Sequence, residues 1–122
     1  AEELWHSNAM KTKFTTAIIL DGHAYGLDNG ILSCIDVETG KKRWKKGRYG
    51  HGQVILINDL LLVTGEFGEV ALVKAQPDSY LELARMNAVE GKTWNYPVLT
   101  GDLLLVRNDR EAACFRLPLL QP

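Results

Sequence analysis

The 122-residue sequence has little of the features that mark special structural classes. It holds only two cysteines and four prolines, which excludes a disulfide-rich scaffold and a proline-rich or collagen-like chain. Fourteen Lys and Arg residues against fifteen Asp and Glu residues leave a net charge of −1, so no overall field attracts nucleic acid or an anionic membrane. The longest apolar runs are four residues, as at 17–20, which is too short to span a membrane.

The composition is that of a globular domain. Apolar residues make up 46% and charged residues 24% of the chain, close to the averages for globular proteins. A chain of this length can bury a real core, but it holds one domain rather than several. We therefore expect a single domain over residues 1–122.

One hairpin pattern occurs three times along the chain. Each copy has an apolar run, a two-residue turn of Asp, Asn or Gly, and a second apolar run, which is typical of a tight β-hairpin. The three copies cover residues 17–26, 54–63 and 98–106. Their turns are Asp21-Gly22, Asn58-Asp59 and Gly101-Asp102.

A third strand is expected after each hairpin, and a more polar fourth strand after the first two. The third strands fall at residues 33–36, 71–74 and 113–116, and the fourth strands at 43–45 and 80–85. Four short antiparallel strands in about 40 residues are typical of one β-propeller blade. The sequence therefore predicts an all-β fold of antiparallel blades, a partial propeller of about three four-stranded blades.

The predicted blade units cover residues 9–47, 48–90 and 91–118. The third unit has no outer strand of its own. Residues 1–8 are expected to be the outer strand of a preceding blade, because Trp5 comes 39 residues before Trp44, in the first unit's outer strand. An open antiparallel meander with accidental internal similarity is the alternative interpretation.

The segment from Cys34 to Trp44 resembles the tryptophan-docking motif of the pyrroloquinoline-quinone (PQQ)-like β-propellers. It reads Cys-Ile-Asp-Val-Glu-Thr-Gly-Lys-Lys-Arg-Trp, against a family pattern of Ala-x-Asp-x-x-Thr-Gly-Lys-x-x-Trp. The resemblance implies that the indole of Trp44 wedges between adjacent blades. The positions that match the motif, with Trp5 as the last residue of an earlier copy, are Asp36, Thr39, Gly40, Lys41, Trp44 and Trp5.

Members of this family divide into PQQ-dependent dehydrogenases and propellers that bind proteins. The dehydrogenases need calcium, a catalytic Asp and often a vicinal cysteine pair, and this sequence has no Cys-Cys. We expect a non-catalytic binding or protein-interaction scaffold, the C-terminal part of a longer PQQ-like propeller, with no catalytic residue, metal or cofactor in this chain. The alternative is the end of a PQQ-dependent alcohol or sugar dehydrogenase whose upstream blades hold PQQ and calcium. By resemblance, the protein is expected in the periplasm or outside the cell.

A candidate binding surface lies in the loops that lead into each inner strand. Two glycines flank His51 in the loop 48–53, which is expected to cross one end of the propeller toward its axis. The repeat places His51 opposite Phe14 and Trp94. In the alternative, these loops only turn corners, and Phe14 and Trp94 close the core. The candidate residues of this axial surface are Lys13, Phe14, Arg48, Tyr49, His51, Gln53, Trp94 and Asn95.

Other reactive residues favour structural interpretations. Cys34 and Cys114 occupy equivalent third-strand positions two blades apart, too distant for a disulfide, and both are expected to be small buried residues. The three histidines show no metal-ligand spacing. Residues 41–48 hold six cations, which would suit an anionic surface, but lysines on an outer strand also deter edge pairing. We expect no nucleic-acid partner.

Three blades cannot close a ring, so the first and last blades are expected to expose faces that need partners. We expect the partner to be the rest of a parent propeller or a second copy of this chain, joined through the open edges as a homo-oligomer. The apolar candidates for those faces are Phe14, Ile18, Val98, Leu104 and Phe115.

Overall fold

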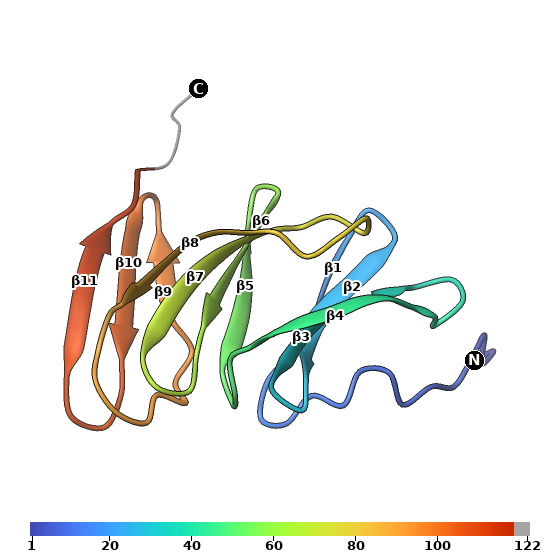
Figure 1. Ribbon diagram of the computed structural model, residues 1–122, viewed down its shortest axis with the longest axis horizontal. Helices are drawn as coiled ribbons and strands as arrows, with labels where there is room; N and C mark the ends of the chain where they lie inside the picture. The colour runs from blue at the N-terminus through green and yellow to red at the C-terminus, as the bar shows by residue number, and fades with distance from the viewer. Residues whose placement is uncertain (119–122) are drawn as a thin grey trace.

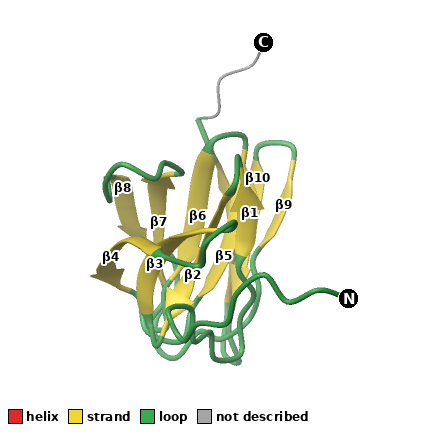
Figure 2. Cartoon of the chain, turned by 90° about the vertical axis from the view of Figure 1, so that its right-hand side faces the viewer, coloured by secondary structure: helices red, strands yellow, loops and turns green. Residues whose placement is uncertain are grey.

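The computed structural model describes residues 1–118, and all regular structure within them is antiparallel β-strand (Figures 1 and 2). The strands form three separate sheets. Sheet 1 holds β1 (Ile18–Leu20), β2 (His23–Asp28), β3 (Ile31–Asp36) and β4 (Lys42–Arg48). Sheet 2 holds β5 (Gln53–Ile57), β6 (Leu60–Thr64), β7 (Glu69–Lys74) and β8 (Glu82–Asn87). Sheet 3 holds β9 (Val98–Thr100), β10 (Leu103–Arg107) and β11 (Ala112–Arg116). The predicted all-β class is confirmed.

The hairpin turns form where the sequence predicts them. The β1–β2 turn is Asp21-Gly22, with φ angles of 49° and 77°. The β5–β6 and β9–β10 turns begin at Asn58 and Gly101, with φ angles of 54° and 59°. Asp, Asn and Gly tolerate this left-handed conformation, whose twist matches that of the paired strands. Each turn therefore sets a register that keeps the apolar residues of both strands on shared faces.

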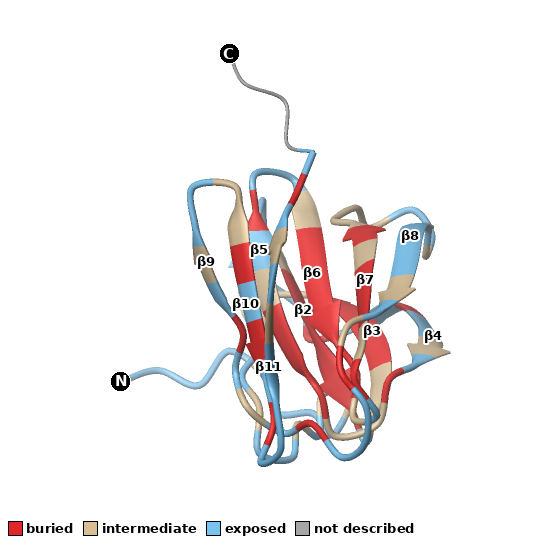
Figure 3. Cartoon of the chain, turned by 90° about the vertical axis from the view of Figure 1, so that its left-hand side faces the viewer, coloured by how far each residue is buried: buried red, intermediate tan, exposed pale blue. Residues whose placement is uncertain are grey.

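The three sheets lie side by side and enclose two apolar cores, which appear as the buried middle strands in Figure 3. The core between sheets 1 and 2 includes Tyr25, Leu27, Val54, Leu61 and Val63. The core between sheets 2 and 3 includes Ile57, Leu62, Val70, Leu104 and Val106. Successive side chains of a strand point to opposite faces, so Leu61 and Leu62 of β6 enter different cores. Sheet 2 is therefore buried on both faces.

The end sheets each have one face without a neighbouring sheet in the described chain. Of the apolar residues expected there, Val98 is exposed, whereas Leu104 is fully buried and Ile18 packs against a core. The expectation is wrong for Leu104 and Ile18, because both lie on strand faces that point toward sheet 2. Cys34 is buried as expected, but Cys114 is exposed, because it pairs with Leu105 on the open face of sheet 3.

Trp44 forms a wedge between sheets 1 and 2. It lies on β4 with only 9% of its surface exposed, and its Nε1–H donates a hydrogen bond to the carbonyl of Gln76 at 2.8 Å. Trp5 makes the equivalent contact with sheet 1, where its Nε1–H donates to the carbonyl of Val37 at 2.6 Å. In both cases the acceptor follows its tryptophan by 32 residues. One docking contact is therefore used twice along the chain.

The turn between β3 and β4 receives the ring of Trp5. The carboxylate of Asp36 accepts hydrogen bonds from the N–H groups of Thr39 at 3.1 Å and Glu38 at 2.8 Å, and these bonds hold its pKa below the usual value. Gly40 closes the turn with a φ of 73°. A Cβ atom at Gly40 would lie 2.5 Å from Cε3 of Trp5, so only glycine allows the indole to approach this closely.

Residues 1–8 form no strand, contrary to the prediction of an outer strand, because no neighbouring strand is present for them to pair with. Trp5 itself is half-buried rather than fully enclosed. Each predicted unit otherwise contains one sheet, except that β4 runs one residue past position 47 to Arg48.

The junction between sheets 2 and 3 lacks a docking tryptophan. On β8, Ala84 pairs with Leu72, as Trp44 of β4 pairs with Cys34. An apolar pocket of about 160 Å³ opens beside Ala84. Its other lining residues include Leu62, Val70, Leu72, Met86 and Leu117. The pocket therefore occupies the place that an indole fills at the preceding junction.

Trp44→Ala is expected to lower the free energy of unfolding by about 3–5 kcal/mol, since it empties a buried aromatic site and leaves the Gln76 carbonyl without its donor. Urea denaturation followed by circular dichroism measures the change. Trp5→Ala should cost less because its ring is only half-buried. Leu83→Ala, at a residue that is 52% exposed, is the control. If Trp44→Ala destabilises no more than this control, Trp44 does not hold the two sheets together.

Ala84→Trp is expected to stabilise the protein by about 0.5–2 kcal/mol, the usual range for cavity-filling substitutions. The new indole would fill the apolar pocket between sheets 2 and 3. The same urea experiment measures the gain, with Leu83→Trp at an exposed position of the same strand as the matched control. A loss of stability in Ala84→Trp would contradict the equivalence of Ala84 and Trp44.

Candidate functional site

Three loops meet at one end of the sheets and carry most of the residues singled out from the sequence. They lead into β1, β5 and β9, and Figure 1 shows them along the lower edge of the molecule. The β6–β7 turn reaches the same end. Backbone hydrogen bonds join these segments, from Glu66 N to Tyr49 O at 2.7 Å and from Thr93 N to Glu66 O at 2.6 Å. The loops into β5 and β9 are therefore both tied to the β6–β7 turn of sheet 2.

An aromatic row crosses this end of the molecule and consists of Phe14, His51 and Trp94, one residue from each loop. The ring centroids of Phe14 and His51 are 5.9 Å apart, and those of His51 and Trp94 are 6.3 Å apart in an edge-on arrangement. Phe14 is 81% exposed and Trp94 is 48% exposed. The two rings therefore do not close the core, and the row is a feature of the surface.

Phe14 has a backbone conformation that is unusual for its residue type. Its φ angle is +59°, in the left-handed region that bulky side chains disfavour. Residues held in such conformations need support from their surroundings, and they cluster at functional sites. The conformation places a large apolar ring in solvent, where it contributes little to the core.

Gln53 supplies the support for both ends of the aromatic row. It is the first residue of β5 and is only 2% exposed. Its side-chain Nε2–H₂ group donates to the carbonyl of Phe14 at 2.9 Å and to the carbonyl of Trp94 at 3.1 Å. One buried amide in sheet 2 thus holds the loops that lead into sheets 1 and 3. The Nε2–H₂ group of this amide is therefore fully used, whereas its Oε1 is buried without a hydrogen-bond partner in the described residues.

Glu66 holds the other face of the row from the β6–β7 turn. Its carboxylate accepts hydrogen bonds from Nε1–H of Trp94 at 2.9 Å and from N–H of His51 at 3.3 Å. The bond from Trp94 is the main reason that the pKa of Glu66 lies below its usual value. Nζ of Lys92 lies 4.7 Å from the centre of the Trp94 ring, in a cation–π contact. Gly50 permits the approach, because a Cβ there would lie 2.5 Å from Oε1 of Glu66.

Tyr96 extends the exposed aromatic surface beyond the row. It is 45% exposed, and its hydroxyl group accepts a hydrogen bond from N–H of Thr16 at 3.1 Å and also bonds to the Thr16 hydroxyl. A shallow pocket of about 280 Å³ lies beside Trp94. Its lining residues are Lys92, Trp94, Asn95 and Asp109. Apolar rings and polar side chains therefore alternate across this end.

Tyr49 does not belong to this surface, contrary to the prediction. It is 2% exposed and packs in the core between sheets 1 and 2. Its hydroxyl group bonds to that of Tyr80 at 2.7 Å and donates to Glu82 at 2.8 Å. Burial and these bonds raise its pKa strongly. The N–H of Tyr49 is held by the carbonyl of Gly30 at 2.8 Å, which fixes the backbone while the ring enters the core.

The remaining predicted residues lie apart from the row or at its margin. Lys13 and Arg48 are exposed, and neither bonds to a side chain of the aromatic row. Asn95 is half-buried in the shallow pocket beside Trp94. Lys41 lies in the β3–β4 turn, where its N–H donates to the hydroxyl oxygen of Thr39 at 3.2 Å. The structure therefore brings together Phe14, His51, Gln53, Trp94 and Asn95 of the predicted surface.

Sequence reasoning missed two residues of this surface, Glu66 and Tyr96. Glu66 lies in a turn of sheet 2 outside the three repeated loops, so no repeat alignment would select it. Tyr96 gave a usable signal, because an aromatic residue follows Trp94 by two positions in a predicted loop.

The side chains around the aromatic row are charged or polar. No three His, Cys, Asp or Glu side chains within residues 1–118 come together in a group that could hold a metal ion. Aromatic rings beside a lysine and a carboxylate offer apolar contact area with polar groups at its edge, which is the composition of protein interfaces.

No family model and no curated protein matches the sequence. The part of the chain that the structure describes has no helix of the length and apolarity needed to cross a membrane.

Gln53→Leu is expected to destabilise the protein by about 1–3 kcal/mol, because the carbonyls of Phe14 and Trp94 lose their donor while the side-chain volume is kept. The intrinsic fluorescence of Trp94 should also shift as its loop loosens, which a Trp5→Phe/Trp44→Phe background isolates. Gln76→Leu is the matched control, since that side chain bonds only to the exposed Ser79. Equal effects of the two substitutions would show that Gln53 does not position the row.

Proposed function

We propose that this chain is a non-catalytic binding module built of PQQ-like propeller blades, and that a protein partner binds to the aromatic row and Tyr96. The single observation that carries the proposal is the ring of Phe14, which is 81% exposed while Gln53 holds the backbone carbonyl of the same residue. A stability role does not account for a bulky exposed ring on a left-handed backbone. A binding role does, because aromatic residues supply most of the contact energy at interfaces.

The blade interpretation is supported by the repetition of strand order and docking contact. Sheets 1 and 2 have the same strand order along the chain, and sheet 3 has the same order in its three strands. Trp5 and Trp44 dock on the next sheet at the same sequence separation. A tryptophan wedged between adjacent blades is what the resemblance to PQQ-like propellers implies.

The proposed surface has the arrangement of an interface, with apolar rings in the middle and charged groups around them. Lys92, Glu66 and Asp109 surround Trp94, and the first two contact its ring or its indole N–H. Rim charges of both signs favour a polypeptide partner over a purely anionic ligand. Hydrogen bonds from Gln53 and Glu66 hold the loops beneath the row, which lowers the entropy lost on binding.

A random peptide library displayed on phage, selected against the intact chain, tests the proposal. Selected peptides are expected to bind Phe14→Ala and Trp94→Ala at least about tenfold more weakly than the native chain, as hot-spot residues require. Fluorescence polarisation with labelled peptides measures the affinities. Leu83→Ala is the matched control, because this residue is an exposed apolar side chain on β8, away from the row.

Peptides that bind Phe14→Ala and Trp94→Ala as well as the native chain would place the binding surface elsewhere. Saturable micromolar binding of PQQ in the presence of calcium would contradict the non-catalytic assignment and favour the dehydrogenase alternative.

A further inference from the structure

We propose that residues 3–9 of one copy of this chain pair with β11 of a second copy and complete sheet 3 as its fourth strand. Two copies that exchange these segments would also bury the open face of sheet 3 against the open face of sheet 1. This interface is separate from the aromatic row and does not depend on the partner proposed there.

One side of the proposed interface is sheet 3, whose last strand in the described residues is an edge strand. Sheets 1 and 2 each continue from their third strand to a fourth, β4 or β8, whereas sheet 3 ends at β11 in the described residues. The outer edge of β11 therefore presents backbone N–H and C=O groups that no strand among residues 1–118 pairs with. An edge of this kind is a template for a strand from another chain.

The other side of the proposed interface is the segment of residues 3–9, which lies beside sheet 1 without being paired to a strand of the described chain. Trp44 belongs to β4, the fourth strand of sheet 1, and docks on sheet 2. Trp5 docks on sheet 1 in the same way, so residues 3–9 lie where the fourth strand of a preceding sheet would lie. These residues form no strand and are mostly exposed. Within residues 1–118, sheet 3 therefore has an edge strand without a fourth strand, and residues 3–9 take a fourth-strand position without a paired strand.

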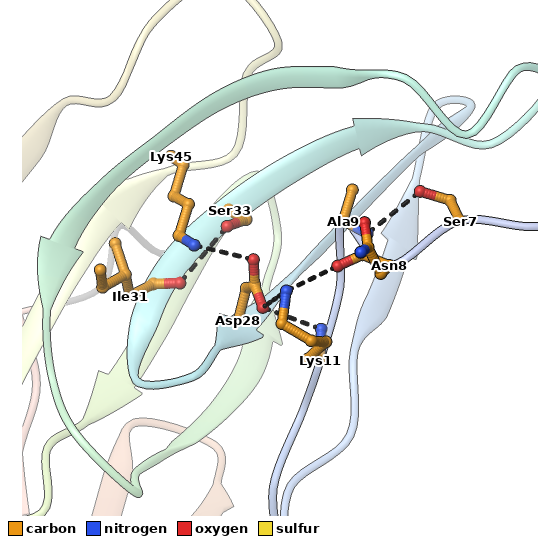
Figure 4. Close-up of polar contacts among 8 residues, drawn as sticks. All are labelled: Ser7, Asn8, Ala9, Lys11, Asp28, Ile31, Ser33 and Lys45. Carbon is orange, nitrogen blue, oxygen red and sulfur yellow. Dashed lines mark hydrogen bonds and ion pairs between the residues drawn. The ribbon is translucent and has the colours of Figure 1, made fainter.

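Polar contacts fix the segment that follows Trp5 onto sheet 1 (Figure 4). The buried carboxylate of Asp28 accepts from N–H of Lys11 at 3.0 Å and from Nζ of Lys45 at 2.9 Å. Nζ of Lys11 donates to the carbonyl of Asn8 at 2.7 Å, and N–H of Ala9 donates to the hydroxyl oxygen of Ser7 at 3.0 Å. The segment is therefore positioned before binding, while its N-terminal end projects away from the three sheets in Figures 1 and 2.

The two open faces match in chemistry. On sheet 3, Leu105 lies between its pairing partners Val98 and Cys114, and all three are exposed. On sheet 1, Ile19 is 65% exposed on the face turned away from sheet 2, whereas its pairing partner Ala24 is already buried within the chain. Stacking of sheet 3 of one copy on sheet 1 of the other would repeat the packing already used twice within the chain.

Charge also favours this occupant. The segment begins with Glu3, which follows Glu2, whereas Arg107 and Arg116 lie in the register positions that share the outer face of sheet 3 with Leu105. Arg116 also lies 3.3 Å from the carboxylate of Asp102. Pairing of the two copies would therefore bring the acidic start of the segment close to Arg107 and Arg116 of the other copy. Because each copy gives one segment and receives one, a two-fold pair closes without leaving a free edge of this type.

Light scattering and sedimentation of the full chain across the micromolar range test the proposal. We expect a mass that rises with concentration to twice the 13.6 kDa of one chain. Leu4→Pro/His6→Pro should abolish the dimer, because each proline removes a backbone N–H beside Trp5 without changing Trp5 itself. Leu4→Ala/His6→Ala keeps both N–H groups and should keep the dimer.

The open faces are tested with exposed residues, so the variants should remain folded. Leu105→Lys should make the protein monomeric, and Leu83→Lys on β8 should leave the dimer intact. Cys114 gives an independent readout, because it is exposed in the single chain while Cys34 is buried. Its reaction with a thiol reagent should slow as the protein concentration rises, and this protection should vanish in Leu105→Lys.

A chain that stays at 13.6 kDa at all concentrations would overturn the proposal and leave the open faces to a different partner. A dimer that survives Leu4→Pro/His6→Pro would overturn strand pairing, whatever the effect of Leu105→Lys. Either result would leave the proposal for the aromatic row intact, since peptide binding there is measured separately.

Discussion

Packing between sheets that share no backbone hydrogen-bond ladder is the constraint on which this structure depends. Strand pairing stabilises each sheet alone, but the sheets stay together only through side chains and loops. Two apolar cores provide most of that attraction without specifying direction. The indole N–H of Trp44 adds direction, because it reaches one carbonyl on the next sheet. This bond therefore fixes the position of sheet 1 on sheet 2, whereas sheets 2 and 3 pack without a docking tryptophan.

The same constraint explains where the structure requires glycine. Gly40 lets Trp5 lie against the turn that it docks on, and Gly30 and Gly50 let two loops approach until a Cβ on Gly30 would lie 2.9 Å from Cα of Gly50. Close loops at one end allow Gln53 to reach carbonyls from both neighbouring segments. The exposed aromatic row is thus a result of how tightly the sheets are joined beneath it.

The two outer sheets, sheets 1 and 3, differ from sheet 2 in having a neighbouring sheet on one face only within residues 1–118. Sheet 2 satisfies both of its faces with neighbours, whereas sheets 1 and 3 each keep one face open in the described chain. Leu105 is apolar although it is exposed, and its counterpart in sheet 2, Leu62, is apolar and buried. A repeated architecture places the same kind of residue at each repeat, so its terminal units carry surfaces suited to a further unit. Trp5 shows this directly, since it docks as Trp44 does without a strand ladder around it.

The sequence by itself determined the class of fold and the three hairpins, because alternation and Asp/Asn/Gly turns are local signals. Its resemblance to the tryptophan-docking motif implied the wedge that Trp44 forms. The sequence also indicated that Phe14, His51 and Trp94 come together, because the repeat aligns their loops. The orientation of each side chain was decided only by the tertiary structure. Tyr49 turned into the core and Cys114 out of it, and Glu66 joined the row from a turn that no repeat selects. Those outcomes depend on which face of a sheet has a neighbour, and neighbours arise from packing between segments that are distant in sequence.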